Sequence, residues 1–557
     1  MTQPYRINPL TRRTTLVGMA GVAAASTLPW AVQAATDPVF RHGIASGDPD
    51  ATSVVIWTRV SGVPAGAVEW EVASDAGFTR IVRNGRFDTS DDRDFTVKVL
   101  VDGLAPGGRY HYRFRAGGRT SPTGRTRTLP TGALDRLGIA LVSCSNYTFG
   151  HFNAYAAIAR DPAIDFVLHT GDYIYEYGAD EWGAATARKL GRVHEPANEI
   201  VSLSDYRTRH AQYKSDIGSQ AMLAAHPLLA CWDDHESANN PWTGGAQNHQ
   251  GDKEGDWGAR REASIRAYFE WMPVREPVPG RTRAQFWRGY SFGDLALLHT
   301  IETRHTARAR QIEYLDHAKS IQTRADADRF MAEVIGAPDR PMLSAEMEGD
   351  LAAALSRSVQ GRQPWRLIGS PMLIARTDVP DLAANGILGD PAKWNDDQKS
   401  LAWRGKWNLP FFTDAWDGYG WARERFYAQA RAAGANDLVV LSGDSHSFWA
   451  NALADAQGRG MGVELGTAGV TSPGDFPENG FAPPVVRQLD AAVASHNSEV
   501  VWTDSLHQGY VRLVLRHGGG QADMVAVRRI DRPDPVTSAI RRFALVRGDG
   551  TVALRPI

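Results

Sequence analysis

Hydrophobic and polar residues alternate along the first part of the chain. Val68, Trp70 and Val72 are separated by single glutamates, and residues 110–115 alternate in the same way. Turn-forming glycines, asparagines and prolines separate these runs. Such alternation predicts short strands with one buried face. We therefore expect residues 36–130 to form a small all-β sandwich of the fibronectin or immunoglobulin type.

The pattern changes after the polar segment 121–136, which has the composition of a linker. Beyond it, short apolar runs without alternation are separated by helical patterns such as residues 258–271. Strands that are buried on both faces predict a central sheet covered by helices. We expect a large α/β domain over residues 136–530. Its strand-length runs include residues 139–142, 166–168, 228–230, 295–298, 367–368 and 438–441.

The residues after Ile530 do not show the pattern of a strand of the main sheet. We expect residues 531–557 to pack back over the α/β domain, near the mouth of its site. The alternative is a loose surface tail.

The first 35 residues have the three parts of an export signal. Arg6, Arg12 and Arg13 precede an apolar run of 13 residues at 16–28, and small residues follow up to Ala34. The run is shorter than the roughly 18 residues that indicate a membrane span. The arginine pair resembles a twin-arginine signal, which predicts export by the twin-arginine machinery to the periplasm or the medium. An ordinary secretory signal is the alternative. No later stretch predicts a transmembrane segment.

Composition excludes several classes of protein. Hydrophobic residues make up 43% and charged residues 22% of the chain, which is typical of globular proteins and not of disordered ones. The net charge of −2 excludes dedicated, sequence-independent nucleic-acid binding, which needs a basic excess. Cys144 and Cys231 are the only cysteines, so a disulfide-rich scaffold and a cysteine-rich zinc module are excluded.

Four of the apolar runs end in side chains that can bind metals. Each group alone is typical of a turn, a helix cap, a solvated loop or a core residue. Ligands of open α/β sheets bind beyond the carboxyl ends of strands, so we expect the four groups to converge. Bound cations would compensate for burying several carboxylates together. The groups are Ser143-Cys144-Ser145-Asn146, Gly171-Asp172-Tyr173-Ile174-Tyr175, Trp232-Asp233-Asp234-His235-Glu236 and Ser442-Gly443-Asp444-Ser445-His446.

Further motifs lie in order around these groups: Val54-Val55-Ile56-Trp57-Thr58-Arg59, Tyr206-Arg207, His226-Pro227, Tyr268-Phe269-Glu270-Trp271-Met272-Pro273, Trp416-Asp417-Gly418-Tyr419 and Thr471-Ser472-Pro473-Gly474. Through these motifs and the four polar groups, the chain resembles the PhoD-type alkaline phosphatases, a branch of the metallophosphoesterase superfamily. The resemblance implies an α/β/β/α layered catalytic domain. One departure is Glu302 before Thr303-Arg304, where the family usually has aspartate.

The resemblance implies a ferric ion bound by Cys144, Asp172, Tyr175 and His446. The residue types are compatible with Fe3+, because tyrosinate and thiolate are anionic ligands that neutralise a trivalent ion. A site of cysteine and histidine alone would have indicated zinc.

The resemblance also implies a Ca2+ ion bound by Asp172, Asp234 and Asp444, which form an oxygen-only site. Asp172 is expected to bridge the two metals. Asn239 or water is an alternative to one of these carboxylates.

Two cations about 3.5–4 Å apart can clamp a phosphoryl group while a metal-bound hydroxide or oxide attacks it. We expect His235 to orient the phosphate or to protonate the leaving oxygen, with a structural histidine as the alternative. Arg207 and Lys214 are candidates for phosphate contacts, or else residues of a solvated helix face. Trp416 and Tyr419 are candidates for the cleft wall, or else core residues.

These expectations describe an exported, monomeric alkaline phosphatase that hydrolyses small-molecule phosphate monoesters and releases inorganic phosphate. The alternative within the family is a phosphodiesterase or phospholipase D-like hydrolase. A non-catalytic adhesion protein with a decayed phosphatase domain is a third hypothesis, although no ligand of the expected motifs is missing. We expect Cys144 to be a metal thiolate and Cys231 a free packed thiol, in place of the disulfide that an oxidising compartment suggests.

Overall fold

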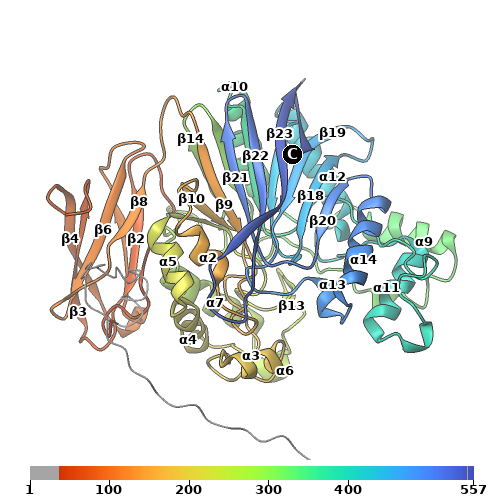
Figure 1. The fold of residues 1–557 in the computed structure, drawn as a ribbon, viewed down its shortest axis with the longest axis horizontal. Coiled ribbons are helices and arrows are strands. Elements are labelled where there is room, and N and C mark those ends of the chain that lie inside the picture. Colours follow the sequence, from red (N-terminus) through yellow and green to blue (C-terminus); the bar gives the residue numbers. More distant parts are fainter. Residues whose placement is uncertain (1–36, 549) are drawn as a thin grey trace, which may run out of the picture.

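The computed structural model describes residues 37–548 and 550–557, so the expected export signal at 1–35 lies outside the described residues. A β-sandwich lies at the left of Figure 1, and a larger layered body lies at the right. Within the described ranges, no helix combines the length and the apolar character that crossing a membrane requires.

The N-terminal strands form the expected β-sandwich. Its core contains the alternating apolar side chains of the sequence pattern, including Val68, Val72, Tyr112 and Phe114. One layer contains β1 (Ile44–Gly47), β2 (Val54–Arg59) and β5 (Thr96–Val101); the other contains β3 (Gly66–Ala73), β4 (Ile81–Thr89), β6 (Arg109–Ala116), β7 (Arg119–Thr120) and β8 (Gly124–Arg127).

The sandwich is continuous with the larger body. Strand β1 pairs in parallel with β11 (Leu228–Ala230), with Gly47 opposite Leu228. A ten-stranded sheet therefore runs in the order β24-β23-β22-β21-β9-β10-β11-β1-β2-β5. The two parts share backbone hydrogen bonds as well as a packed surface, which the local sequence pattern does not reveal.

Two sheets pack face to face in the larger body. The first has the parallel strands β9 (Leu137–Val142), β10 (Phe166–His169) and β11 at its centre, followed by β21 (Gly509–Arg516) and β22 (Gly519–Val527). Leu141, Leu168, Leu367, Val439 and Leu465 belong to the core between the sheets. The second sheet has the order β14 (Gly289–Phe292), β15 (Ala296–Thr300), β16 (Trp365–Ser370), β17 (Leu438–Ser442), β19 (Gly460–Gly466), β18 (Phe448–Ala454) and β20 (Val500–Asp504).

Helices cover the outer face of each sheet. Side chains of α2 (Asn153–Ile158), α4 (Leu203–Lys214), α5 (Ile217–Ala225) and α7 (Trp257–Trp271) pack on the first sheet. Those of α10 (Ala345–Gln360) and α12 (Gly420–Ala432) pack on the second. The expected α/β/β/α layering is confirmed. Further α-helices in the described part of the chain are α3 (Ala184–Leu190), α6 (Gly251–Glu254), α8 (Tyr314–His317), α9 (Arg324–Phe330), α11 (Asp396–Trp407), α13 (Asp475–Glu478) and α14 (Pro483–His496).

The expectation that the residues after Ile530 form no strand of the main sheet was wrong, although the segment does pack on the α/β domain. Residues Thr537–Gly548 and Thr551–Pro556 form β23 and β24, which extend the first sheet at its edge. Of the long strand β23, only Phe543 and Leu545 are buried. An edge strand with so few buried positions gives little hydrophobic signal. The described residues of this segment do not line the site cavity.

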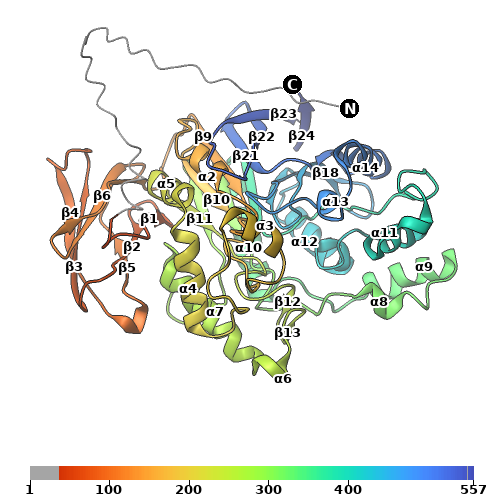
Figure 2. The same cartoon turned by 60° about the horizontal axis from the view of Figure 1, so that its bottom comes forward.

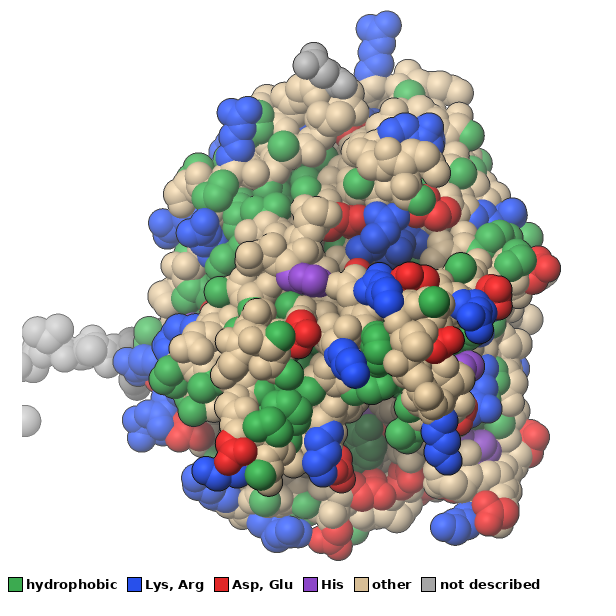
Figure 3. All heavy atoms as spheres, turned by 90° about the vertical axis from the view of Figure 1, so that its right-hand side faces the viewer, with side chains coloured by type: hydrophobic (Ala, Val, Ile, Leu, Met, Phe, Trp, Pro, Cys, Tyr) green, Lys and Arg blue, Asp and Glu red, His purple; other side chains and the backbone are tan. Residues whose placement is uncertain are grey.

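Charges are mixed on the surface. On the face drawn in Figure 3, lysine and arginine side chains are interspersed with aspartate and glutamate side chains. This agrees with the net charge of −2.

Candidate metal centre

The polar groups converge because they follow neighbouring strands. Cys144 lies just beyond β9, Asp172 beyond β10 and Asp234 beyond β11, and these three strands are parallel neighbours. Asp444 and His446 lie beyond β17 of the second sheet. A bridge between Ser143 and Gly469 joins the two sheets at this point. The side chains therefore meet where the carboxyl ends of both sheets come together.

The backbone at the site is strained. Cys144, Asp172, Asp444 and His446 have φ values of 58°, 55°, 66° and 55°, which side chains other than glycine rarely adopt. Each such residue costs about 1–3 kcal/mol and persists only where the surroundings enforce it. At Gly171, with φ 103°, a Cβ atom would collide with the backbone of Asp233. The tight loops that position these side chains therefore have a strained backbone.

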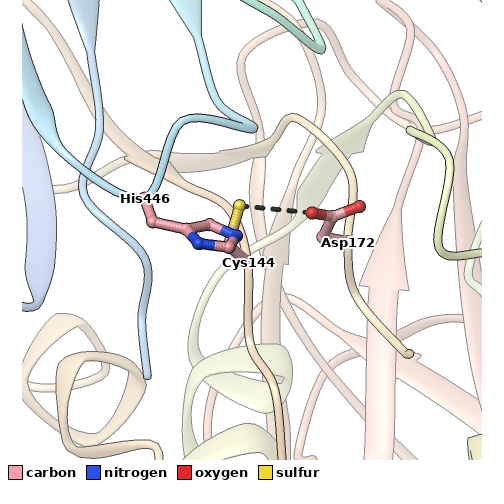
Figure 4. Close-up of side chains that lie close together, drawn as sticks. All are labelled: Cys144, Asp172 and His446. Atoms are coloured by element: carbon pink, nitrogen blue, oxygen red, sulfur yellow. Dashed lines mark hydrogen bonds between the residues drawn. The ribbon is translucent and has the colours of Figure 1, made fainter. Parts of the chain in front are cut away.

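The first group of side chains surrounds Oδ2 of Asp172. The thiol of Cys144 donates to it from 3.4 Å and the hydroxyl of Tyr175 from 3.1 Å, and Nε2 of His446 lies 3.4 Å from the same hydroxyl. Figure 4 shows Cys144, Asp172 and His446 facing one another. Nδ1 of His446 donates to the carbonyl of Pro473, which turns Nε2 toward the group. This is the usual orientation of a metal-binding histidine.

Burial is the main influence on protonation in the first group. Burial, and then the charge of Asp172, raise the pKa of the Cys144 thiol well above its ordinary value. Burial, and then the charge of Asp172, also raise the pKa of the Tyr175 hydroxyl well above its ordinary value. Burial, and then His235, lower the pKa of His446 to about 4, so its imidazole is neutral. A bound cation would favour the thiolate and the tyrosinate, and a neutral imidazole is the form that binds metals.

The second group consists of carboxylates. Ligand atoms of Asp172, Asp233, Asp234 and Asp444 lie within 4.8 Å of one another. Oδ1 of Asp172, Oδ2 of Asp233 and Oδ1 of Asp234 are buried without a hydrogen-bond partner among the described residues. Burial, and then the charge of Asp234, raise the pKa of Asp172 well above its ordinary value. Buried carboxylate oxygens without a donor require compensation, so this group suits a cation that binds oxygen.

Arg304 faces the second group and was not foreseen. Its Nε donates to Oδ1 of Asp233 at 2.5 Å, and its Nη2 lies 3.7 Å from Asp234 and 3.8 Å from Asp444. Glu302, the departure from the family pattern, accepts hydrogen bonds from the backbone N–H groups of Arg304 and His305 at 2.7 Å. The glutamate therefore shapes the turn that directs Arg304 into the site.

Two further buried glutamates organise the loops. Oε2 of Glu176 accepts a hydrogen bond of 2.7 Å from Nδ1 of His235. Burial lowers the pKa of His235, but Asp234 and Glu176 outweigh this effect and raise it well above the ordinary value. Glu236 accepts from the backbone N–H groups of Asp172 and Asp233 and so ties their loops together. Glu236 belongs to one of the predicted groups, whereas Glu176 does not, and its position directly after Tyr175 is its only local signal.

A cavity of about 420 Å³ opens over the centre. Asp234, His235, Asp444 and His446 line its inner part. Trp182, which the sequence analysis missed, stacks on the ring of His446 at 5.8 Å and 14° and on that of His235 at 6.4 Å and 19°. A larger cavity of about 690 Å³ lies elsewhere, beside Trp287 and Arg288, and contains none of the metal-binding candidates.

Other candidates lie outside the site. Arg207 forms a bidentate ion pair with Glu270, at 2.7 and 2.8 Å, and it is not among the residues that line the cavity, so its catalytic role stays a prediction that this arrangement does not support. Its helix, α4, directs this side chain toward α7. Lys214 is buried with its ammonium 4.8 Å from the ring of Trp57. Trp416 and Tyr419 belong to the core on the second sheet.

The two cysteines are both buried and free. Cys144 lies within the first ligand group, whereas Sγ of Cys231 contacts the backbone carbonyl of His169 at 3.9 Å. The structure thus has a packed thiol at Cys231, as expected, and no disulfide between them.

The family model of PhoD-like phosphatases matches residues 139–524, and the model of the N-terminal domain of PhoD-like phosphatases matches residues 23–130. The chain belongs to the PhoD-like phosphatase family. It is 32% identical over 521 residues to alkaline phosphatase D of Bacillus subtilis (strain 168), an alignment that covers 90% of this chain and 80% of the relative. A solved structure of PhoD superposes on this chain with a TM-score of 0.74 and 30% sequence identity. The superposition covers 94% of this chain and 92% of the PhoD chain. This PhoD-like phosphatase is therefore a phosphoric ester hydrolase, as the sequence motifs predicted.

Proposed function

We propose that this PhoD-like phosphatase is an exported, monomeric, metal-dependent alkaline phosphatase that hydrolyses phosphate monoesters. The observation that carries the proposal is the position of Asp172. Its Oδ2 accepts hydrogen bonds from the thiol of Cys144 and the hydroxyl of Tyr175, and its Oδ1 is buried without a hydrogen-bond partner among the described residues. The same side chain also belongs to the carboxylate group. A residue so placed can bridge two cations of different chemistry.

The proposed metals are those that the resemblance to the family implies, and the two donor sets are compatible with them. Fe3+ suits Cys144, Asp172, Tyr175 and His446, because the first three become anionic ligands. Ca2+ suits the oxygen atoms of Asp172, Asp234 and Asp444. When bound, the two cations would supply Lewis-acid stabilisation of the charge on the phosphoryl oxygens.

The chain's own residues then position the substrate and move a proton. Hydrolysis breaks the bond between phosphorus and the leaving oxygen, joins phosphorus to the oxygen of water, and adds a proton to the leaving oxygen. His235 is the candidate donor of that proton, because it lines the cavity and its pKa is raised. Glu176 accepts a hydrogen bond from Nδ1 of His235, so Nε2 is the nitrogen that remains available to the substrate. The ring of Trp182 stacks on the imidazoles of both His235 and His446.

A phosphodiesterase is the second candidate. The cavity of about 420 Å³ has room for more than a phosphate group, which supports a substrate with a second ester arm. Both activities use the same centre and differ in what the outer cavity accepts.

Kinetics and metal analysis test the proposal. Purified protein should contain iron and calcium and should hydrolyse nitrophenyl phosphate with a higher kcat/KM than bis-nitrophenyl phosphate. A clear preference for the bis-ester would replace the monoesterase with the phosphodiesterase. Full activity after both metals have been removed by a chelator would overturn metal dependence. Cell fractionation of the full-length chain, with Arg12 and Arg13 both changed to lysine as the control, tests export by the twin-arginine machinery.

A further inference from the structure

A separate cavity of about 460 Å³ lies between the β-sandwich and the α/β domain. Strands β6 and β8 bound it on the sandwich side, and the segments that follow α2 and α5 bound it on the other. In both Figure 1 and Figure 2, α5 lies between the sandwich and α2. Asp165 and Pro227, which line the cavity, directly precede β10 and β11. The cavity is therefore at the amino ends of these strands, whereas the metal centre is at their carboxyl ends.

Basic side chains dominate the charge of this cavity. Four arginines and two aspartates line it among the described residues, although the whole chain has a net charge of −2. The arginines are Arg109, Arg125, Arg127 and Arg160. We call this site the basic cavity.

Strand pairing places several of the basic side chains on one face. In the antiparallel pair of β6 and β8, Arg109 lies opposite Arg127, and His111 lies opposite Arg125. Residues that are directly opposite, or two apart along a strand, point to the same side of the sheet. Like charges in opposite positions destabilise a sheet, so this arrangement requires negative charge from elsewhere.

The aspartates of the basic cavity supply only part of that negative charge. Asp165 lies 2.5 Å from Arg127 and also pairs with Arg136 at 3.0 Å. Asp161 pairs with Arg512 at 2.9 Å. Because Arg136 and Arg512 do not line the cavity, each aspartate is also neutralised by an arginine from outside it.

Arg125 and Arg160 have no acidic partner among the described residues of the cavity. The guanidinium of Arg125 reaches the carbonyl of Ala159 at 3.5 Å, next to the residue that carries the second arginine. Both arginines are exposed to solvent at the cavity. Two positive charges from different domains are thus directed to one hollow and remain unpaired.

Two histidines face Arg125 from opposite sides of the cavity. Burial, and then the charge of Arg125, lower the pKa of His111 on the sandwich and lower that of His226 on the α/β domain to about 4. Both imidazoles are therefore neutral at pH 7. Nδ1 of His111 is buried without a hydrogen-bond partner among the described residues, so it can form a hydrogen bond with a ligand.

We propose that the basic cavity binds a phosphate group, either as inorganic phosphate or as the end group of a larger phosphate ester. The guanidinium groups of Arg125 and Arg160 balance the charge of a dianion, and their planar forks match its oxygen atoms. His111 adds a hydrogen bond through Nδ1. The basic cavity and the metal centre share no lining residue, so the inference does not depend on the proposed function.

Calorimetric titration of the metal-loaded enzyme with inorganic phosphate tests the proposal, with ionic strength held constant by sodium chloride. We expect a class of binding that Arg125→Gln with Arg160→Gln weakens at least about tenfold, because two charge-assisted contacts are lost. The kcat for nitrophenyl phosphate should stay unchanged in this variant, which also shows that the fold is intact. Arg324→Gln with Arg329→Gln, which removes two exposed arginines of α9, is the matched control and should leave phosphate binding unchanged.

Phenylphosphonate, whose carbon–phosphorus bond resists hydrolysis, distinguishes the two sources of the phosphate group. Binding to the basic cavity that is tighter than that of inorganic phosphate would support a larger ester as the ligand, and weaker binding would support free phosphate. Unchanged binding of both anions in the variant without Arg125 and Arg160, or equal weakening in the α9 control, would overturn the proposal. Neither result would affect the proposed function, which is measured by hydrolysis at the metal centre.

Discussion

Oε2 of Glu176 lies 2.7 Å from Nδ1 of His235, and both side chains are buried behind the proposed metal ligands. Glu176 also accepts a hydrogen bond of 2.7 Å from the backbone N–H of Asn239. The glutamate therefore fixes both the ring of His235 and the loop that carries it. It also stabilises the protonated form of the imidazole, which a group that protonates a leaving oxygen requires.

Glu176→Gln should lower kcat about 10- to 100-fold, as loss of a supporting partner does in similar centres. Because Glu176 raises the pKa of His235, its loss should lower that pKa. His235 would then lose its proton at lower pH, and the alkaline limb of the kcat profile should move to lower pH. Iron and calcium contents should stay unchanged. An unchanged pH profile would show that His235 does not supply the proton.

The hydrophobic pattern predicted a central sheet covered by helices and the convergence of Cys144, Asp172 and His446, because these residues follow strands of strong pattern. The packing of two sheets between helices was implied by the family resemblance. Arg304 was not foreseen, since its contact with Asp233 joins residues 71 positions apart and leaves no local signal. Trp182 lies in a loop without periodicity. The edge strands β23 and β24 were missed because backbone pairing, and not burial, holds them in the sheet.

Asp172→Ala should remove both metals and lower kcat at least about a thousandfold, because one side chain contributes to both ligand groups. Elemental analysis and nitrophenyl phosphate kinetics measure the two effects. Asp316→Ala, which changes an aspartate of α8 outside the site cavity, is the control. Loss of only one metal would mean that Asp172 does not bridge the two sites.

The two cysteines form a matched pair of tests. Cys144→Ser should lose iron, activity and any visible absorbance from charge transfer between thiolate or tyrosinate and iron. Cys231→Ala should keep all three and lose about 1–2 kcal/mol of stability, because it removes one buried sulfur from the core. If Cys231→Ala lost iron as well, the assignment of Cys144 as the sole thiolate would be wrong.

Arg304→Met should destabilise the protein by about 3–5 kcal/mol, because Asp233 is left buried without its partner. Both side chains of this ion pair are fully buried. Chemical denaturation of the metal-loaded enzyme measures the change. Arg324→Met breaks an exposed pair with Asp328 and should change stability by less than about 1 kcal/mol. Equal effects of the two changes would contradict a structural role for Arg304.

Lys214 is buried against the rings of Trp57 and Tyr173, and burial lowers its pKa to about 7. In the unfolded chain this lysine keeps its proton up to about pH 10.4. Between these values the unfolded state binds more protons, so this group makes the free energy of unfolding rise with pH.

Lys214→Met should therefore increase the free energy of unfolding at pH 6, where the buried charge is least favourable, and the gain should shrink toward pH 10. The exposed Lys189→Met is the control and should follow the unmodified protein at every pH. Thermal or urea unfolding at several pH values measures the slope. If the free energy of unfolding of Lys214→Met rose with pH as steeply as that of the unmodified protein, Lys214 would remain protonated in the fold. Its ammonium group would then be stabilised by the hydroxyl of Tyr173 at 3.2 Å and by the ring of Trp57.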